Sequence, residues 1–130
     1  MKSSSCSTSF VSIAPFYDRL MSFVNYPSWV DYIEKIIVLN NVQEKMIFDV
    51  ACGTGVCLQL WQNKGYQVVG LDKSLGMLQV CREKMSSHDT ALLINGDMRN
   101  FRLARPIPVI TCLYDSLNYL LTEADLLRCF

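Results

Sequence analysis

The spacing of hydrophobic residues along the chain changes near residue 46. Before that point, apolar residues recur at intervals of three and four, first at Phe16, Leu20 and Phe23, then at Trp29, Ile33, Ile36 and Ile37. Such spacing puts the side chains on one stripe of a helix, and it predicts two N-terminal helices. Pro15 suits the first turn of the first helix, and Ser28 is expected to cap the second.

After residue 46, short continuous runs of Val, Ile and Leu alternate with segments of helical spacing. The apolar runs cover residues 46–50, 66–72, 91–95 and 108–114. Continuous apolar runs of this length are typical of strands buried on both faces, as in parallel sheets. The expected fold is therefore an α/β, Rossmann-like, doubly wound parallel sheet that follows the two N-terminal helices.

Two helices are expected between these strands. The first covers residues 55–64, and its inward side chains are expected to be Val56, Leu60 and Trp61. Ser74 is expected to cap the second, whose inward side chains would be Leu75, Leu78, Cys81 and Met85.

The C-terminal end of the sequence resembles the beginning of a further helix. Thr122 and Asp125 have the spacing of a capping box, yet only Leu126 to Phe130 remain to continue the helix. The fourth strand would also lie at an exposed apolar sheet edge, through which the chain could self-associate. We therefore expect residues 1–9 to be a flexible tail and residues 10–130 to be the N-terminal portion of a longer domain.

Composition narrows the class of protein. With 130 residues, 51% hydrophobic and 18% charged, the chain is expected to fold as one globular domain. Its formal net charge is zero, so nothing favours a nucleic acid or an anionic membrane surface as partner. The N-terminal residues "MKSSSCSTSF" lack the apolar core of a signal peptide.

The six cysteines give no sign of a metal site or a disulfide framework. They stand at positions 6, 52, 57, 81, 112 and 129, without a C-x-x-C pair. A reducing cytoplasm is the simplest setting for such a chain.

Each of the four predicted strands has an aspartate close to its C-terminal end. They are Asp49, Asp72, Asp97 and Asp115. In a parallel sheet the carboxyl ends of all strands lie at one edge, and ligands bind in the crevice there. Any one aspartate alone is more often a turn or cap residue, but the four together predict a ligand site.

The turn after the first strand reads "FDVACGTG" and contains Gly53 and Gly55. Glycine permits positive φ and a close approach of the backbone to a ligand. A nucleoside or an amino-acid group could lie on this turn, and Asp72 could accept hydrogen bonds from both hydroxyls of a ribose.

These segments resemble the motifs of class I S-adenosylmethionine-dependent methyltransferases. "FDVACGTG" is similar to the first motif, in which Asp49, Gly53 and Gly55 match and Ala51 replaces the first glycine. "VVGLDKSLGMLQVCREK" and "INGDMRNF" resemble the second and third motifs, and "CLYDSLNYLL" resembles the fourth-strand motif. The resemblance implies a seven-stranded fold, of which four strands are visible.

The resemblance also implies a cofactor, S-adenosyl-L-methionine, and a set of residues that bind it. Asp72 would bind the ribose, Asp97 and Met98 would meet the adenine, and Tyr17 would cover the cofactor. The remaining residues implied are Asp49, Ala51, Cys52, Gly53, Gly55, Lys73 and Met77. The implied reaction is in-line methyl transfer to a small-molecule acceptor.

The residues after the fourth strand supply the candidates for a base or for orienting the acceptor. They are Tyr114, Asp115, Asn118 and Tyr119. His88 precedes the third strand and is expected at the opposite edge. Cys52 has no evident partner base, so we interpret it as a small turn residue.

Two alternatives remain. The chain could bind a cofactor or a partner without turnover, as a fragment of such a domain. An NAD(P)-dependent oxidoreductase is disfavoured, because its G-x-G-x-x-G fingerprint would require glycine where this chain has Leu58.

Overall fold

Four parallel strands form the centre of the fold, in the order β3-β2-β1-β4. The computed structural model describes residues 12–85, 91–114 and 116–130. The strands are β1 (Met46–Val50), β2 (Gln67–Asp72), β3 (Ala91–Asn95) and β4 (Val109–Thr111). The predicted parallel, Rossmann-like sheet is confirmed, although β4 is shorter than the expected strand over 108–114.

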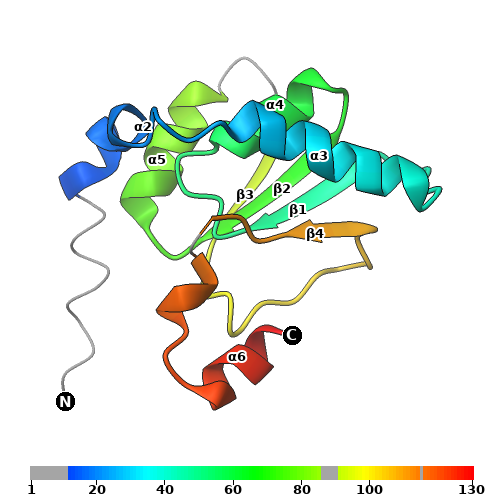
Figure 1. Cartoon of the computed structure of the whole chain (residues 1–130). Coiled ribbons are helices and arrows are strands. Elements are labelled where there is room, and N and C mark those ends of the chain that lie inside the picture. The colour runs from blue at the N-terminus through cyan, green and yellow to red at the C-terminus, as the bar shows by residue number, and fades with distance from the viewer. Residues whose placement is uncertain (1–11, 86–90, 115) are drawn as a thin grey trace.

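One face of the sheet is covered by three helices, as Figure 1 shows. They are α3 (Tyr26–Leu39), α4 (Val56–Asn63) and α5 (Leu75–Lys84). Their inward residues form one hydrophobic core with the sheet, in which Val30, Leu58 and Cys81 are fully buried. Ser74 caps α5 as predicted, since its Oγ accepts a hydrogen bond from the Met77 N–H.

The other face of the sheet is covered by the long connection between β3 and β4. After β3 the chain passes to the far side of β1, and a right-handed crossover places this connection opposite the three helices. Its apolar side chains, Phe101 among them, pack on Phe48 and Leu71, with the Phe48 and Phe101 ring centroids 5.1 Å apart. The segments η2 (Ser116–Tyr119) and α6 (Glu123–Cys129) follow β4, and α6 lies on this side (Figure 1).

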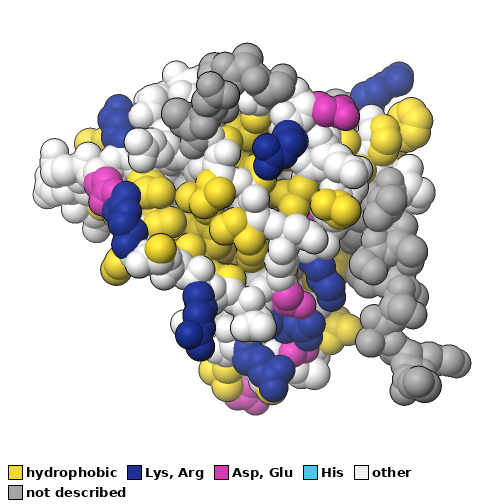
Figure 2. Space-filling view, turned by 180° about the vertical axis from the view of Figure 1, so that it is seen from behind, with side chains coloured by type: hydrophobic (Ala, Val, Ile, Leu, Met, Phe, Trp, Pro, Cys, Tyr) yellow, Lys and Arg dark blue, Asp and Glu magenta, His cyan; other side chains and the backbone are white. Residues whose placement is uncertain are grey.

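This second face is covered less completely than the first. Leu92 of β3 and Ile110 of β4 are each more than half exposed. Seen from behind, hydrophobic side chains gather across the middle of the molecule between scattered charged groups (Figure 2).

The N-terminal segment lies against the glycine turn and α5. Helical residues run without a break from 12 to 20 and include a short 3₁₀ turn, η1 (Ala14–Phe16), and one turn of α-helix, α2 (Tyr17–Leu20), so the helix ends before Phe23, which was expected on its stripe. Asp18 fastens it, because its carboxylate accepts a hydrogen bond from Thr54 and pairs with Lys84. These contacts keep α2 beside the carboxyl ends of the strands.

The predicted stripe of α3 is only partly correct: Ile37 is buried and Ile33 packs against the core, but Trp29 and Ile36 are exposed, and Val30 is buried in their place. The helix begins at Tyr26 and its cap is Asn25, whose Oδ1 accepts from the Ser28 N–H at 3.2 Å, so Ser28 is not the cap. The buried residues are Val30 and Ile37, whereas Trp29 and Ile36, expected in the core, are 38% and 43% exposed.

The inward faces of α4 and α5 also differ from expectation. Cys57 and Leu58 are buried beside Trp61 in α4, where Val56 and Leu60 are only half-buried. In α5, Leu75 points to solvent because Met77 takes the inward position one turn before Cys81.

Two glycines allow the helices to approach the sheet closely. Gly70 lies in the middle of β2, and a Cβ there would be 2.6 Å from Leu58 Cδ1. Gly55 has φ +80°, and a Cβ there would be 2.3 Å from Cys81 Sγ. Close packing of α4 therefore depends on a glycine in the strand, opposite Leu58.

We expect Gly55→Ala to destabilise the fold more than Gly53→Ala does. Both positions have positive φ, which costs a residue with a Cβ about 1–2 kcal/mol. At Gly53 an added Cβ would meet nothing within 4 Å, whereas at Gly55 it would overlap Cys81 and cost about 1–3 kcal/mol more. Urea unfolding of the two variants measures the difference, and equal losses of stability would contradict the packing argument.

Candidate functional site

The turn between β1 and α4 has an unusual backbone. Ala51, Gly53 and Gly55 all have positive φ, at +60°, +57° and +80°. Ala51 stands where the family motif has its first glycine, and its Cβ makes this conformation cost about 1–2 kcal/mol. The change from glycine to Ala51 therefore does more than add a methyl group, because it leaves the backbone of the turn strained where the turn faces the cavity.

Asp72 joins the end of β2 to this turn. Its Oδ2 accepts a hydrogen bond from the Gly53 N–H at 2.8 Å, and its Oδ1 accepts from the Ser74 N–H at 2.8 Å. Burial raises the pKa of Asp72, and the backbone hydrogen bonds oppose that shift. Each carboxylate oxygen has a second lone pair, so Asp72 can still accept hydrogen bonds from two hydroxyls.

Asp49 forms the floor of the site. It is only 3% exposed, and its Oδ1 accepts a hydrogen bond from Thr111 Oγ1 of β4 at 2.7 Å. Burial raises the pKa of Asp49 to about 7, although the hydrogen bond from Thr111 lowers it. The carboxyl group therefore keeps its proton to a higher pH than an ordinary aspartate does.

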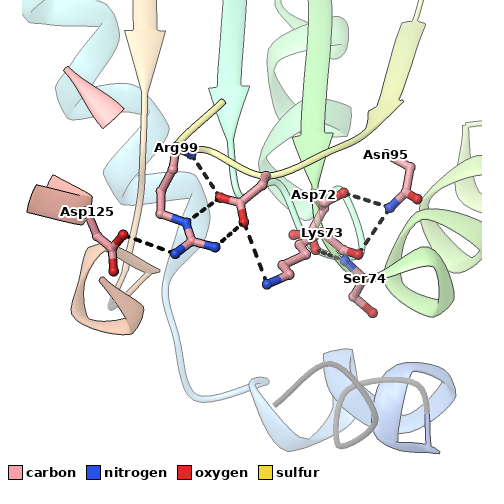
Figure 3. A network of polar contacts seen from close by, with 7 residues as sticks. Asp72, Lys73, Ser74, Asn95, Arg99 and Asp125 are labelled. Carbon is pink, nitrogen blue, oxygen red and sulfur yellow. Dashed lines mark hydrogen bonds and ion pairs between the residues drawn. The ribbon is translucent and has the colours of Figure 1, made fainter. Parts of the chain in front are cut away.

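Asp97 has a different environment at the rim. Its Oδ2 lies 2.6 Å from Arg99 Nη2 and 3.6 Å from Lys73 Nζ, and Arg99 Nη1 also contacts Asp125 of α6 at 3.1 Å. Figure 3 shows the Arg99 side chain reaching from the loop after β3 towards Asp125. Hydrogen bonds from Arg99 lower the pKa of Asp97, so this carboxylate stays ionised.

These groups surround one cavity of about 580 Å³ at the carboxyl ends of the strands. The predicted residues that line it are Tyr17, Asp49, Ala51, Cys52, Gly53, Asp72, Lys73, Met77, Asp97, Met98, Tyr114 and Tyr119. Gly55 and Asn118 are not among the lining residues, and Gly55 contacts Cys81 instead. Asp115 and His88 lie outside the described residues, as do residues 1–9.

Several lining residues were not predicted. They include Tyr26, Thr54, Ser74, Arg99, Leu120 and Asp125. Thr54 and Ser74 could have been predicted from their places in turns at strand ends. Arg99 could have been predicted from its spacing to Asp97. Tyr26 and Asp125 reach the cavity only through tertiary packing, which no local pattern indicates.

Cys52 does not have the properties of a nucleophile. Its thiol donates to the Gly53 carbonyl oxygen at 3.9 Å, and the neighbouring Cys81 thiol together with burial raises the pKa of Cys52. Among residues 12–85, 91–114 and 116–130, no group of His, Cys, Asp or Glu is arranged to hold a metal ion. Within the same ranges, no helix is long and apolar enough to cross a bilayer.

Comparison with known proteins identifies the family. A family model described as a methyltransferase domain matches residues 47–130. The chain belongs to the methyltransferase domain family. It is 36% identical over 124 residues to the putative methyltransferase YqeM of Bacillus subtilis (strain 168), which covers 93% of this chain and 48% of that protein.

Two further relatives agree. A sugar N,N-dimethyltransferase of Streptomyces fradiae, acting on dTDP-3-amino-3,6-dideoxy-alpha-D-glucopyranose, is 38% identical over 80 residues, or 62% of this chain and 30% of that protein. The crystal structure of an S-adenosylmethionine-dependent methyltransferase from Clostridium acetobutylicum ATCC 824 superimposes with a TM-score of 0.79 and 31% identity. That match covers 93% of this chain and 50% of the other.

These matches confirm the predicted methyltransferase family, its Rossmann-like fold and S-adenosyl-L-methionine as its cofactor. The chain spans about half the length of the curated relatives it matches most fully. The oxidoreductase alternative receives no support from the family match.

The raised pKa of Asp49 predicts a dependence of stability on pH. Between about pH 4, the ordinary pKa of an aspartate, and pH 7, the folded state holds a proton that the unfolded state has lost. The free energy of unfolding should therefore fall as pH rises through this window, by at most about 1.4 kcal/mol per pH unit. Asp49→Asn keeps an acceptor for Thr111 and should remove this slope, which urea unfolding at several pH values measures. An unchanged slope in the variant would contradict the assignment.

Proposed function

We propose that the chain carries the cofactor-binding half of an S-adenosylmethionine-dependent methyltransferase that acts on a small-molecule acceptor by in-line transfer. The observation that carries this proposal is the cavity of about 580 Å³ at the carboxyl ends of four parallel strands. It brings together the strained turn at Gly53, the carboxylate of Asp72 and the rim at Asp97.

The residues that line the cavity fit the parts of such a cofactor. Asp72 has two lone pairs left for a ribose diol, and Asp97 and Met98, which line the cavity, would meet the adenine. The turn at Ala51, Cys52 and Gly53 would receive the amino-acid group, with Asp49 beneath it. Lys73, Met77 and Tyr17 also line the cavity, whereas Gly55 lies outside the lining and is the N-cap of α4.

When bound, the cofactor supplies an activated methyl group on a sulfonium, so the protein mainly orients the acceptor and excludes water. Tyr114 and Tyr119 line the cavity and are the described candidates for that role. Asn118 lies next to them in η2, outside the lining, and Asp115 is retained from the sequence alone.

The remaining expectations concern partners and location. We propose a cytoplasmic protein with a small-molecule substrate and without a nucleic-acid or membrane partner, supported by zero net charge and by free thiols at all described cysteines. Self-association through the edge of β4 is supported by the strand order, in which β4 pairs only with β1 among the described strands.

We expect the chain to bind S-adenosylhomocysteine, and Asp72→Asn to weaken that binding. Loss of a charged hydrogen-bond acceptor costs about 1–3 kcal/mol, which corresponds to roughly 5- to 150-fold in the dissociation constant. Isothermal titration calorimetry measures the effect. Asp31→Asn is the matched control, because Asp31 is an exposed residue of α3 that pairs with Lys64 and does not line the cavity.

A second measurement separates catalysis from binding alone. Transfer of a labelled methyl group to small-molecule acceptors would support the enzyme, whereas binding without transfer would favour the non-catalytic alternative. If S-adenosylhomocysteine does not bind at all, the proposed function is wrong.

A further inference from the structure

Four tyrosines from separate segments meet at one side of the cavity. Tyr17 belongs to α2, Tyr26 begins α3, Tyr114 follows β4 and Tyr119 ends η2. All four line the cavity, and we call them the tyrosine cluster. Because these segments are far apart in sequence, their convergence is a product of the tertiary fold.

Two rings of the cluster, those of Tyr26 and Tyr114, contact Trp29. Its ring centroid is 6.5 Å from that of Tyr26 in an edge-on arrangement, and 5.9 Å from that of Tyr114. This contact explains why Trp29 is not in the core: it braces two lining residues from outside the cavity. The contacts with Trp29 therefore hold the rings of Tyr26 and Tyr114 in place beside the cavity.

Tyr114, whose ring contacts Trp29 and lines the cavity, has a strained backbone conformation. Its φ is +62°, in the left-handed region that bulky side chains rarely adopt. Strain of this kind is maintained where surrounding contacts over-determine it, and it concentrates at functional sites. Here the contact with Trp29 and the place in the cavity wall account for it.

The charges around the cavity leave it suited to a cation. Among the described residues, neither Asp49 nor Asp72 pairs with a lysine or arginine, although both line the cavity. The basic groups nearby are already paired. Lys73 pairs with Asp97, Arg99 with Asp97 and Asp125, and Lys84 with Asp18.

The tyrosines add to this preference and do not oppose it. Burial raises the pKa of Tyr17, and raises that of Tyr26 to about 12, so both hydroxyls stay neutral. A neutral aromatic ring presents a negative face, which attracts an ammonium group. Because Asp49 and Asp72 are proposed to hold the cofactor, the rings of the tyrosine cluster are the groups left to recognise an amine of the acceptor.

From this arrangement we propose that the methyl acceptor is an amine-bearing small molecule whose ammonium group is bound by the tyrosine cluster. The inference rests on the proposed function, since it names the substrate class of the same site. For transfer, the bound ammonium gives one proton to water. The free nitrogen lone pair then forms the bond to the methyl carbon while the carbon–sulfur bond breaks and its electron pair stays on sulfur. The products are the N-methylated ammonium and S-adenosylhomocysteine.

The test compares a cation with its neutral isostere. Choline and 3,3-dimethylbutan-1-ol have the same shape, but only choline carries a charge. With the chain saturated by S-adenosylhomocysteine, we expect choline to bind roughly 5- to 30-fold more tightly, the range for cation–π contacts at partly desolvated sites. Calorimetry measures both constants, and the tryptophan fluorescence of the chain gives a second reading because Trp29 contacts Tyr114.

Variants at Tyr114 show whether the rings cause the preference. Tyr114 is 41% exposed, so the change should leave the fold intact, as circular dichroism verifies. Tyr114→Leu should lose most of the choline preference and Tyr114→Phe should keep it. Tyr32→Leu, at an exposed tyrosine of α3 that does not line the cavity, should change nothing.

Three outcomes would overturn the inference, and they are distinguishable from one another. If S-adenosylhomocysteine does not bind, the proposed function fails and the amine assignment with it. If it binds but choline shows no preference over the alcohol, only the amine assignment fails. If choline binds but is displaced by S-adenosylmethionine and not by S-adenosylhomocysteine, the cluster holds the sulfonium, and the acceptor assignment is wrong.

Discussion

The carboxylate of Asp72 is the interaction on which the rest of the site depends. It ends β2, yet it accepts hydrogen bonds from the backbone of Gly53, in the turn after β1, and of Ser74, before α5. Isolated burial of a charge would be costly, and these N–H groups supply part of what water would have supplied. Because the turn contains several residues at positive φ, it needs such an anchor to keep one conformation.

The distribution of charge around the cavity follows from the topology. Strand order places Asp49 in a central strand, where helices on one face and the connection on the other exclude water from it. Asp97 follows the edge strand β3, where long basic side chains can reach it. Burial therefore raises the pKa of Asp49 on the floor of the cavity, whereas hydrogen bonds from Arg99 lower the pKa of Asp97 at its rim.

Much of this architecture could be predicted from the sequence. Continuous apolar runs predicted the four strands and their parallel pairing, and the caps at Ser74 and Thr122 were predicted correctly because capping depends on local spacing. The convergence of Asp49, Asp72 and Asp97 on one cavity followed from strand direction alone. Each of these features depends on residues close together in the chain or on a general rule of sheets.

What could not be predicted depends on packing between distant segments. Trp29 was expected on the helix stripe, but its ring contacts Tyr114, which follows β4 and is distant in sequence. The ion pair between Arg99 and Asp125 joins a loop to α6, and no spacing indicates it. The positive φ of Ala51 was hidden because alanine rarely adopts it, so the residue type concealed the conformation of the turn.

The hydrogen bond from Thr111 to Asp49 has a consequence for the edge of the sheet. β4 is three residues long and pairs only with β1 among the described strands, so its attachment is weak for its position. Ionised Asp49 accepts a stronger bond from Thr111 than protonated Asp49 does. A positively charged guest that keeps this carboxylate ionised thereby tightens the outermost strand, and amide hydrogen exchange along β4 would report, from outside the cavity, the charge of what the cavity holds.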